Sequence, residues 1–163
     1  MENEVRQLIL KLRNIFEGNP WYGESVIQKL DALDLGVVNE PPITGCNSIG
    51  RLVQHVINWR IFAIKKLEGD KEFDIPLNGP MDWPDIHIGT IKGWEKMMQN
   101  LNETQTKIID LLSDRTSSFL KGQVPGREYD FQFLIEGIIQ HDIYHLGQIR
   151  LINLLINHDD QNL

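Results

Sequence analysis

The stretch that decides the fold is DFQFLIEGIIQHDIYHLGQIRLINLLI, at residues 130–156. Its apolar residues recur every three or four positions, which is the spacing of one face of an α-helix. That face consists of Phe131, Leu134, Ile135, Ile138, His141, His145, Ile149, Ile152 and Ile156. Asp130 precedes it at an N-cap position, where a carboxylate accepts a hydrogen bond from a free backbone N–H. The stretch predicts one long helix with two histidines on its buried face.

Three further segments show the same periodicity, and they cover residues 3–16, 48–69 and about 90–112. Ser48 is the predicted N-cap of the second segment, and Gly69 ends it. A shorter helix is expected to begin after Ser25, where Gln28 completes a capping box. Few runs of strict alternation occur, so an extensive sheet is not expected. These patterns predict an all-α fold, a bundle of four helices.

Two segments without helical periodicity connect the predicted helices. The first runs from Gly69 to Gly89 and contains three prolines, which predicts a long crossover connection along the bundle. The second is a turn region marked by Gly122, Pro125 and Gly126, and it has room for a short hairpin. No internal repeat is found, so we expect residues 1–163 to form one domain.

Composition and charge exclude several classes of function. Sixteen Lys and Arg stand against twenty-three Asp and Glu, and the net charge of −7 disfavours nucleic acid as a partner. No stretch has the ~20 apolar residues that cross a bilayer, so no membrane is expected as a partner. Cys46 is the only cysteine, which excludes an intramolecular disulfide and suits a reducing compartment. We therefore expect a cytoplasmic protein.

Three histidines lie on predicted buried faces. His141 and His145 are four residues apart on one helix, so their imidazoles project from the same side. His55 lies on the apolar face of the helix at 48–69 and can supply a third nitrogen. Each of the three could instead be a core histidine that bonds to a neighbour, and periodicity alone leaves both interpretations open. His87 and His158 share no face with the others, so we expect them to be solvated and to have no ligand role.

Longer motifs surround these histidines. They are WYGES at 21–25, SI at 48–49 followed by LVQH at 52–55, DWP at 82–84 and HDIYHLGQI at 141–149. Together with Trp59, they resemble the DinB/YfiT-like family of metal-dependent enzymes, and the likeness spans nearly the whole chain. The resemblance implies an up-and-down four-helix bundle with one metal site formed by His55, His141 and His145.

We expect this site to bind one divalent transition-metal ion, with no organic cofactor. Zinc or nickel is favoured, and iron or copper also suits three imidazole ligands. Three protein ligands leave a coordination position open, which is typical of catalytic rather than structural sites.

Three further residues near the histidines are candidates for a catalytic role. Asp142 gives the segment a His-Asp-x-x-His pattern that is similar to the His-Glu-x-x-His of metalloproteases, in which the carboxylate is a general base. Asp is one methylene shorter, so an exposed or supporting carboxylate is favoured. Tyr144 could donate to a substrate oxyanion or simply pack. Gln148 lies one turn beyond His145 and could orient its imidazole, bond a ligand, or face solvent.

The leading hypothesis for function is an enzyme whose metal activates water or a low-molecular-weight thiol, and hence a hydrolase or a thiol transferase. Its partner would be a small-molecule substrate, such as a thiol. The alternative is a non-catalytic metal or small-ligand binding module that responds to stress. A third hypothesis is a structural dimerisation bundle in which the histidines are relics.

A two-fold homodimer is also expected. The resemblance implies it, because relatives of this kind are commonly dimers. The sequence adds that Ile9, Phe16, Met97 and Met98 widen the apolar faces of the first and third long helices. A wide apolar face can contact both the core and a partner.

Overall fold

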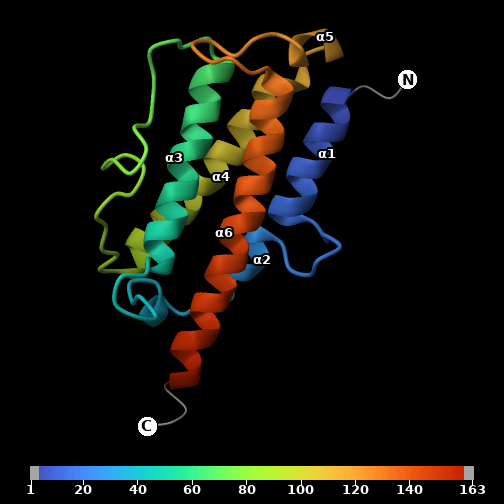
Figure 1. The fold of residues 1–163 in the computed structure, drawn as a ribbon. Coiled ribbons are helices and arrows are strands. Elements are labelled where there is room, and N and C mark those ends of the chain that lie inside the picture. The colour runs from blue at the N-terminus through green and yellow to red at the C-terminus, as the bar shows by residue number, and fades with distance from the viewer. Residues whose placement is uncertain (1–3, 160–163) are drawn as a thin grey trace.

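Four long helices lie side by side in the computed structural model, which describes residues 4–159 (Figure 1). The long helices are α1 (Glu4–Glu17), α3 (Ile49–Leu67), α4 (Ile91–Ser113) and α6 (Phe131–Asp159). The short ones are α2 (Val26–Asp31), the 3₁₀ turn η1 (Leu35–Val37) and α5 (Ser117–Leu120). An isolated antiparallel bridge joins Gln123 to Asp130, where the sequence left room for a hairpin. The all-α class is confirmed.

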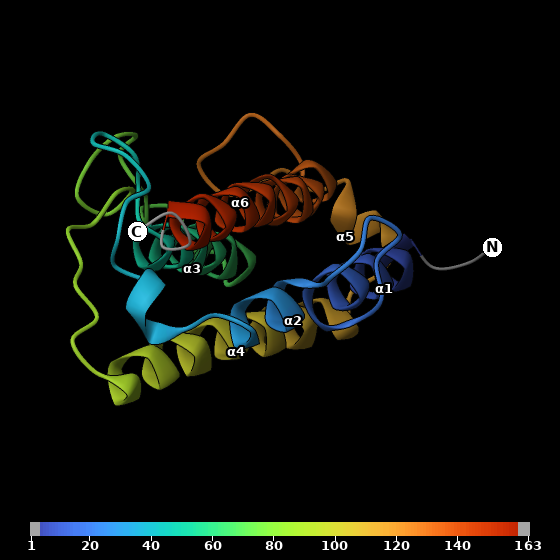
Figure 2. The same cartoon turned by 90° about the horizontal axis from the view of Figure 1, so that it is seen from below.

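The long helices form a ring in which α3 contacts α4 and α6, and α1 also contacts α4 and α6. The two views show that α1 and α6 run in one direction while α3 and α4 run in the other (Figures 1 and 2). The crossover at residues 68–90 causes this order, because it leads the chain back to the start of the bundle before α4 begins (Figure 1). The helices therefore do not alternate strictly, as the up-and-down order implied by the resemblance would require.

Local sequence signals set the helix starts. Ser25 and Gln28 form the predicted capping box at α2, and Ser48 accepts a backbone N–H bond at the start of α3. Thr90 does the same for α4. The carboxylate of Asp130 accepts the N–H of Phe133 at 2.8 Å, as predicted for the start of the last helix. Each cap satisfies a backbone donor that the helix itself leaves free.

Helix α3 ends in a Schellman motif. Gly69 has a φ of +92°, a conformation that glycine adopts without steric cost. Its N–H bonds to the carbonyl of Lys66, and the N–H of Asp70 bonds to that of Lys65. The buried ammonium of Lys66 also donates to the carbonyls of Asp70 and Lys71, at 2.9 and 3.0 Å. This end directs the chain into the crossover.

The hydrophobic core lies between the four long helices, and it takes up residues that the sequence offered to a partner. Phe16, Met97 and Met98 are only 1%, 5% and 9% exposed. Ile9 is partly buried and packs against the same core. The argument for a partner surface at these positions is therefore wrong, because one chain already covers them. The homodimer itself stays a prediction.

The remaining differences from the expected helices are small. The expected first residue of α1, Asn3, lies outside the described residues, and α2 ends at Asp31, whereas the apolar spacing that follows Ser25 continues to Leu33. The turns η1 and α5 were not predicted, because three or four residues span about one helical turn and show no periodicity. No helix between residues 4 and 159 is long and apolar enough to cross a membrane.

Candidate metal centre

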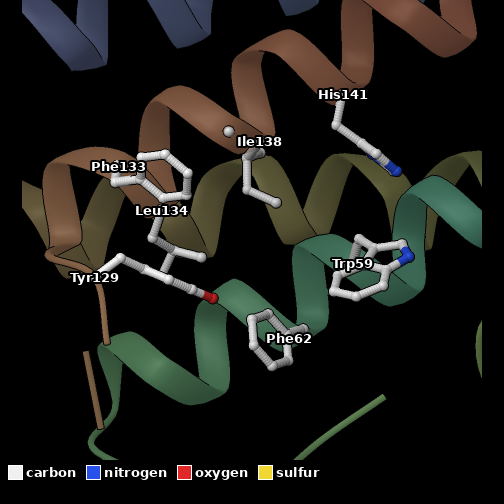
Figure 3. Close-up of a pocket in the computed structure, with 8 residues that line it drawn as sticks. Trp59, Phe62, Tyr129, Phe133, Leu134, Ile138 and His141 are labelled. Atoms are coloured by element: carbon white, nitrogen blue, oxygen red, sulfur yellow. The ribbon is translucent and has the colours of Figure 1, made fainter. Parts of the chain in front are cut away.

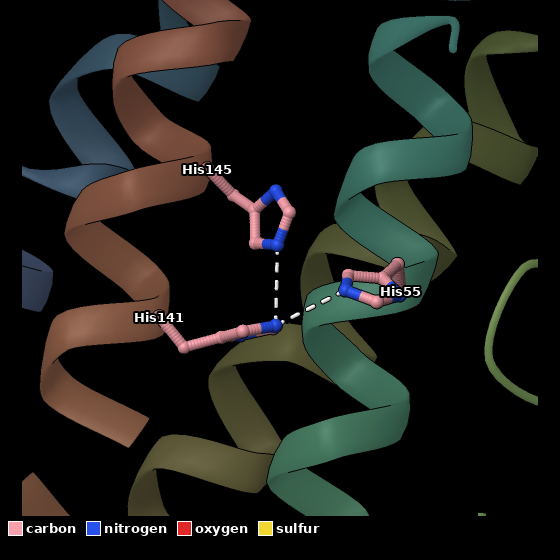
Figure 4. Close-up of side chains that lie close together, drawn as sticks. All are labelled: His55, His141 and His145. Atoms are coloured by element: carbon pink, nitrogen blue, oxygen red, sulfur yellow. Dashed lines mark hydrogen bonds between the residues drawn. The ribbon is translucent and has the colours of Figure 1, made fainter. Parts of the chain in front are cut away.

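Three imidazole rings meet between α3 and α6 (Figure 4). His141 Nε2 lies 3.0 Å from His55 Nε2 and 3.1 Å from His145 Nε2. One ring nitrogen from each histidine falls within 4.8 Å of the other two. The structure thus brings together the three histidines that the sequence and the resemblance selected. They come from two helices, and His55 and His141 are 86 residues apart in the chain.

The spacing of these nitrogens fits ligands of a single ion. Two imidazole nitrogens that each lie about 2.0–2.1 Å from one metal are about 2.9–3.4 Å apart at the usual coordination angles. The two Nε2 separations, 3.0 and 3.1 Å, fall in this range. Both short contacts of His141 therefore match the spacing of ligands to one ion, and the third pair lies within 4.8 Å.

The tautomer of His55 is set by Asp82. His55 Nδ1 lies 2.7 Å from the backbone carbonyl oxygen of Asp82 and 3.0 Å from its carboxylate Oδ1. Both oxygens can only accept, so Nδ1 carries the proton and donates it. The Nε2 of the neutral ring is then a bare lone pair that points at the centre. Such an acceptor behind a ligating histidine fixes its tautomer and orientation in metal sites.

His145 is held in the same way by its own helix. Its Nδ1 donates to Gln148 Oε1 at 2.8 Å, one turn further along α6. This is the orienting role that the sequence allowed for Gln148. The His145 ring is 4% exposed, and burial lowers the pKa of its imidazole below the ordinary value. The ring is therefore neutral near pH 7 and presents a second lone pair to the centre.

His141 is the third histidine of the set, and its ring nitrogens are not both satisfied by hydrogen bonds. Its Nε2 lies between the other two nitrogens, and its Nδ1 is buried without a hydrogen-bond partner. A proton on this Nε2 can satisfy only one of the two short contacts, because His55 and His145 both offer lone pairs. Burial, followed by the neighbouring His145, lowers the pKa of His141 to about 3. Three imidazoles with converging nitrogens are the donor set of a cation.

We did not predict a role for Asp82 in the site from the sequence, although its side chain supports His55. Its carboxylate accepts bonds from Trp59 Nε1 at 2.9 Å and from the backbone N–H of Asn78 at 2.8 Å. Asn78 adopts a φ of +60° in the tight turn that aims its N–H at Asp82. Asp82 is 3% exposed, so a buried carboxylate supports His55 from behind. The signal was present in the DWP motif, but the Pro-rich crossover offered no periodicity from which to place it.

The rest of the crossover is attached to α3 around the site. The Trp83 ring stacks on the His55 imidazole, with centroids 3.8 Å apart and planes 6° apart. Arg51 Nη2 donates to the carbonyl of Trp83 at 3.1 Å, and Asn58 Nδ2 donates to that of Met81 at 2.6 Å. These bonds hold the segment that carries Asp82 against α3.

Asp142 lies on the core side of α6, so of the two favoured roles, an exposed or a supporting carboxylate, the exposed one is wrong. Its Oδ1 and Oδ2 accept from Arg60 Nε at 3.2 Å and Nη2 at 2.5 Å, and the two side chains are 3% and 1% exposed. Arg60 also donates to Gln105 Oε1 at 3.0 Å. Burial raises the pKa of Asp142, and the guanidinium of Arg60 opposes this. Because both oxygens are engaged by Arg60, the arrangement favours a structural role over that of a general base.

The remaining sequence candidates lie apart from the convergent nitrogens. Tyr144 is 64% exposed, and its ring meets His145 edge-on with centroids 4.9 Å apart. His87 is exposed in the crossover, as expected. The side chain of His158 lies outside the part of the chain that the structure describes, so its predicted solvation stays a prediction.

The site is accessible on the side of His141. His55 and His145 are each 4% exposed, whereas His141 is only partly buried. A pocket of about 160 Å³ borders His141 and the Trp59 ring. Figure 3 shows these two side chains at one end of the pocket. A small molecule can therefore approach the nitrogens from the side of His141.

Comparison with known proteins agrees with this geometry. No curated protein and no solved structure matched the chain. A sequence profile described as the DinB superfamily matches residues 24–149. That range includes all three histidines, the whole of α3, the part of α6 up to Ile149, and Asp82. The chain therefore belongs to the DinB superfamily.

Proposed function

We propose that the protein is a metal-dependent enzyme in which His55, His141 and His145 hold one divalent transition-metal ion. The observation that carries this proposal is the convergence of three Nε2 atoms, two of them on rings whose Nδ1 donates to an acceptor on the far side, which leaves the Nε2 lone pair directed at the centre. A protein core that used these histidines only for packing would need a proton between each pair. One proton on His141 Nε2 cannot satisfy both short contacts, so the arrangement supports a metal ion as the shared partner of the three nitrogens.

The ion would supply Lewis acidity and lower the pKa of a water or thiol that reaches its open side. The chain's own residues would do the rest. Asp82 and Gln148 keep His55 and His145 in the ligating tautomer. Trp83 covers the His55 ring and excludes water from that side. The partly exposed His141 leaves room for a substrate beside the pocket.

The reaction that fits is hydrolysis or the transfer of a low-molecular-weight thiol to a small electrophile. Zinc or nickel is the proposed ion, since borderline metals favour imidazole ligands, and iron or copper would also bind. A cytoplasmic location, in which thiols stay reduced, agrees with the single cysteine. A non-catalytic metal-binding module is the alternative, and the two differ only in turnover.

Elemental analysis of untagged protein tests the site. Wild type should carry about one ion per chain, and His55→Ala should lose most of it because two imidazoles from one helix remain. His87→Ala is the matched control and should keep the wild-type content, because His87 lies exposed in the crossover. Full metal content in His55→Ala would show that the cross-helix site is wrong.

Turnover tests the enzyme. Purified protein should consume cysteine in the presence of a chlorodinitrobenzene electrophile, and removal of the ion by a chelator should abolish the reaction. Ester hydrolysis should be measured in parallel for the water-based alternative. If the loaded protein has neither activity across a panel of small electrophiles and esters, the non-catalytic binding module is favoured instead.

A further inference from the structure

We propose that the pocket beside His141 binds an uncharged apolar group of about the size of a benzene ring, carried by the substrate. The inference rests on the proposed function for the reaction, but the pocket itself can be tested without it. Its substrate class is a small molecule whose reactive end meets the histidines and whose other end is an aromatic ring or a branched alkyl group.

The lining of the pocket supports an apolar occupant. It is formed by side chains of α3, of α6 and of the loop before α6 (Figure 3). They are Trp59, Phe62, Tyr129, Phe133, Leu134 and Ile138, with Gly137 and His141 completing the wall. Trp59 Nε1 already donates to Asp82, so the indole offers its ring rather than a free donor. Away from His141 the lining has no cationic side chain and its polar side chains are the Trp59 indole and the Tyr129 hydroxyl, so a carboxylate or phosphate held there would lose its hydration with little compensation.

The size of the pocket sets the size of the group. Its volume of about 160 Å³ is close to that of an apolar protein cavity of about 150 Å³ that stays dry and binds benzene. A single ring or a branched chain of similar bulk therefore fits inside it. Phe133 is 64% exposed at the end away from His141, so the pocket opens to solvent there (Figure 3).

Gly137 keeps the space open. A Cβ built at this position would meet no atom within 4 Å, and its φ lies outside the left-handed region. The backbone there requires no glycine, and glycine is unfavourable in a helix interior. A side chain at 137 would extend into the pocket instead of into packed atoms. The position therefore offers a way to fill the pocket while the histidines stay in place.

The first experiment measures toluene binding by ligand-detected NMR, on protein as purified and after removal of metal. Wild type should bind toluene in both states, and Gly137→Leu should lose at least about tenfold in affinity because leucine occupies the pocket. Gly147→Leu is the matched control, since Gly147 lies on the same helix, lines a different pocket and also has no atom near its Cβ. Equal toluene affinity in wild type and Gly137→Leu would overturn the proposal.

The second experiment joins the pocket to the ion. On cobalt(II)-loaded protein, phenylimidazole should bind at least about tenfold more tightly than imidazole, as followed by the visible cobalt spectrum. Imidazoleacetate should bind no more tightly than imidazole, which tests the proposal on wild type alone. A preference for the carboxylate, or none for the phenyl ring, would contradict an apolar pocket. Toluene binding to protein that takes up no cobalt would instead contradict the proposed function and leave the pocket standing.

Discussion

Replacement of Asp142 by alanine should destabilise the protein by about 3–5 kcal/mol, without loss of metal. The reason is the position of its partner. Arg60 is 1% exposed, and its guanidinium donates two hydrogen bonds to Asp142 and one to Gln105. The variant would leave the guanidinium in the core with only the bond to Gln105 and the face of Phe16, 4.7 Å from the ring centroid. A buried charge without its counter-ion loses the attraction but still bears the cost of dehydration.

The size of this loss can be compared with the whole stability. Domains typically unfold with about 5–15 kcal/mol, so Asp142→Ala would remove a large part of it. Replacing both partners, as Arg60→Met with Asp142→Leu, should restore most of the loss, because a well-packed apolar pair can substitute for a buried ion pair. Single and double variants together form a cycle that measures the coupling between the two side chains.

Urea unfolding followed by circular dichroism measures these free energies. Asp110→Ala is the matched control, because Asp110 is exposed within helix α4, and its change should stay within about 0.5 kcal/mol. The metal content of folded Asp142→Ala should equal that of wild type. The structural role is refuted if Asp142→Ala costs less than about 1 kcal/mol. Loss of turnover with stability and metal content unchanged would instead identify Asp142 as a catalytic base.

Three further predictions concern the site and the assembly. Asp82→Ala should weaken metal binding about tenfold, measured in competition with a chelator; the loss is limited because the backbone carbonyl still holds His55. Asp85→Ala, at an exposed residue of the same crossover, is the control, and equal metal affinity in the two variants would contradict the role of Asp82. As the pH falls from about 6.5 toward 3, metal-free protein should lose up to about 1.4 kcal/mol of stability per pH unit through His141, because the imidazole takes up its proton more readily in the unfolded chain than in the folded one. Urea unfolding of His141→Asn should lack this pH dependence. Light scattering should give about 38 kDa for a two-fold dimer, and a mass near 18.9 kDa would show a monomer.

Much of the helical framework could be predicted from the sequence, because helix starts and apolar faces are local features. Ser25, Ser48 and Asp130 cap the helices that their positions predicted, since a cap depends on a hydrogen bond across three residues. His141 and His145 share a face for the same reason, as four residues make about one helical turn. The short helices η1 and α5 and the bridge before α6 could not be predicted in this way, because they are too short to show a periodic pattern.

The third ligand depended on more than local geometry. Periodicity placed His55 on a buried face but not opposite His141, and the resemblance selected the trio. Only the tertiary structure brings the two Nε2 atoms to 3.0 Å, because that distance depends on how α3 and α6 lie against each other. The crossover along the bundle was predicted from the sequence, and the structure shows that it leaves α4 parallel to α3 (Figure 1).

The sequence by itself determined which residues can ligate and which helix faces are buried, since both follow from residue type and spacing along one chain segment. The tertiary structure alone decided what stands behind those ligands. Asp82 reaches His55 across 27 residues, and Arg60 reaches Asp142 across 82. Such polar pairs form because burial in the core removes the water that each group would otherwise bind. Which partner then lies within hydrogen-bond distance depends on how whole helices and the crossover pack, and no short-range sequence pattern encodes that packing.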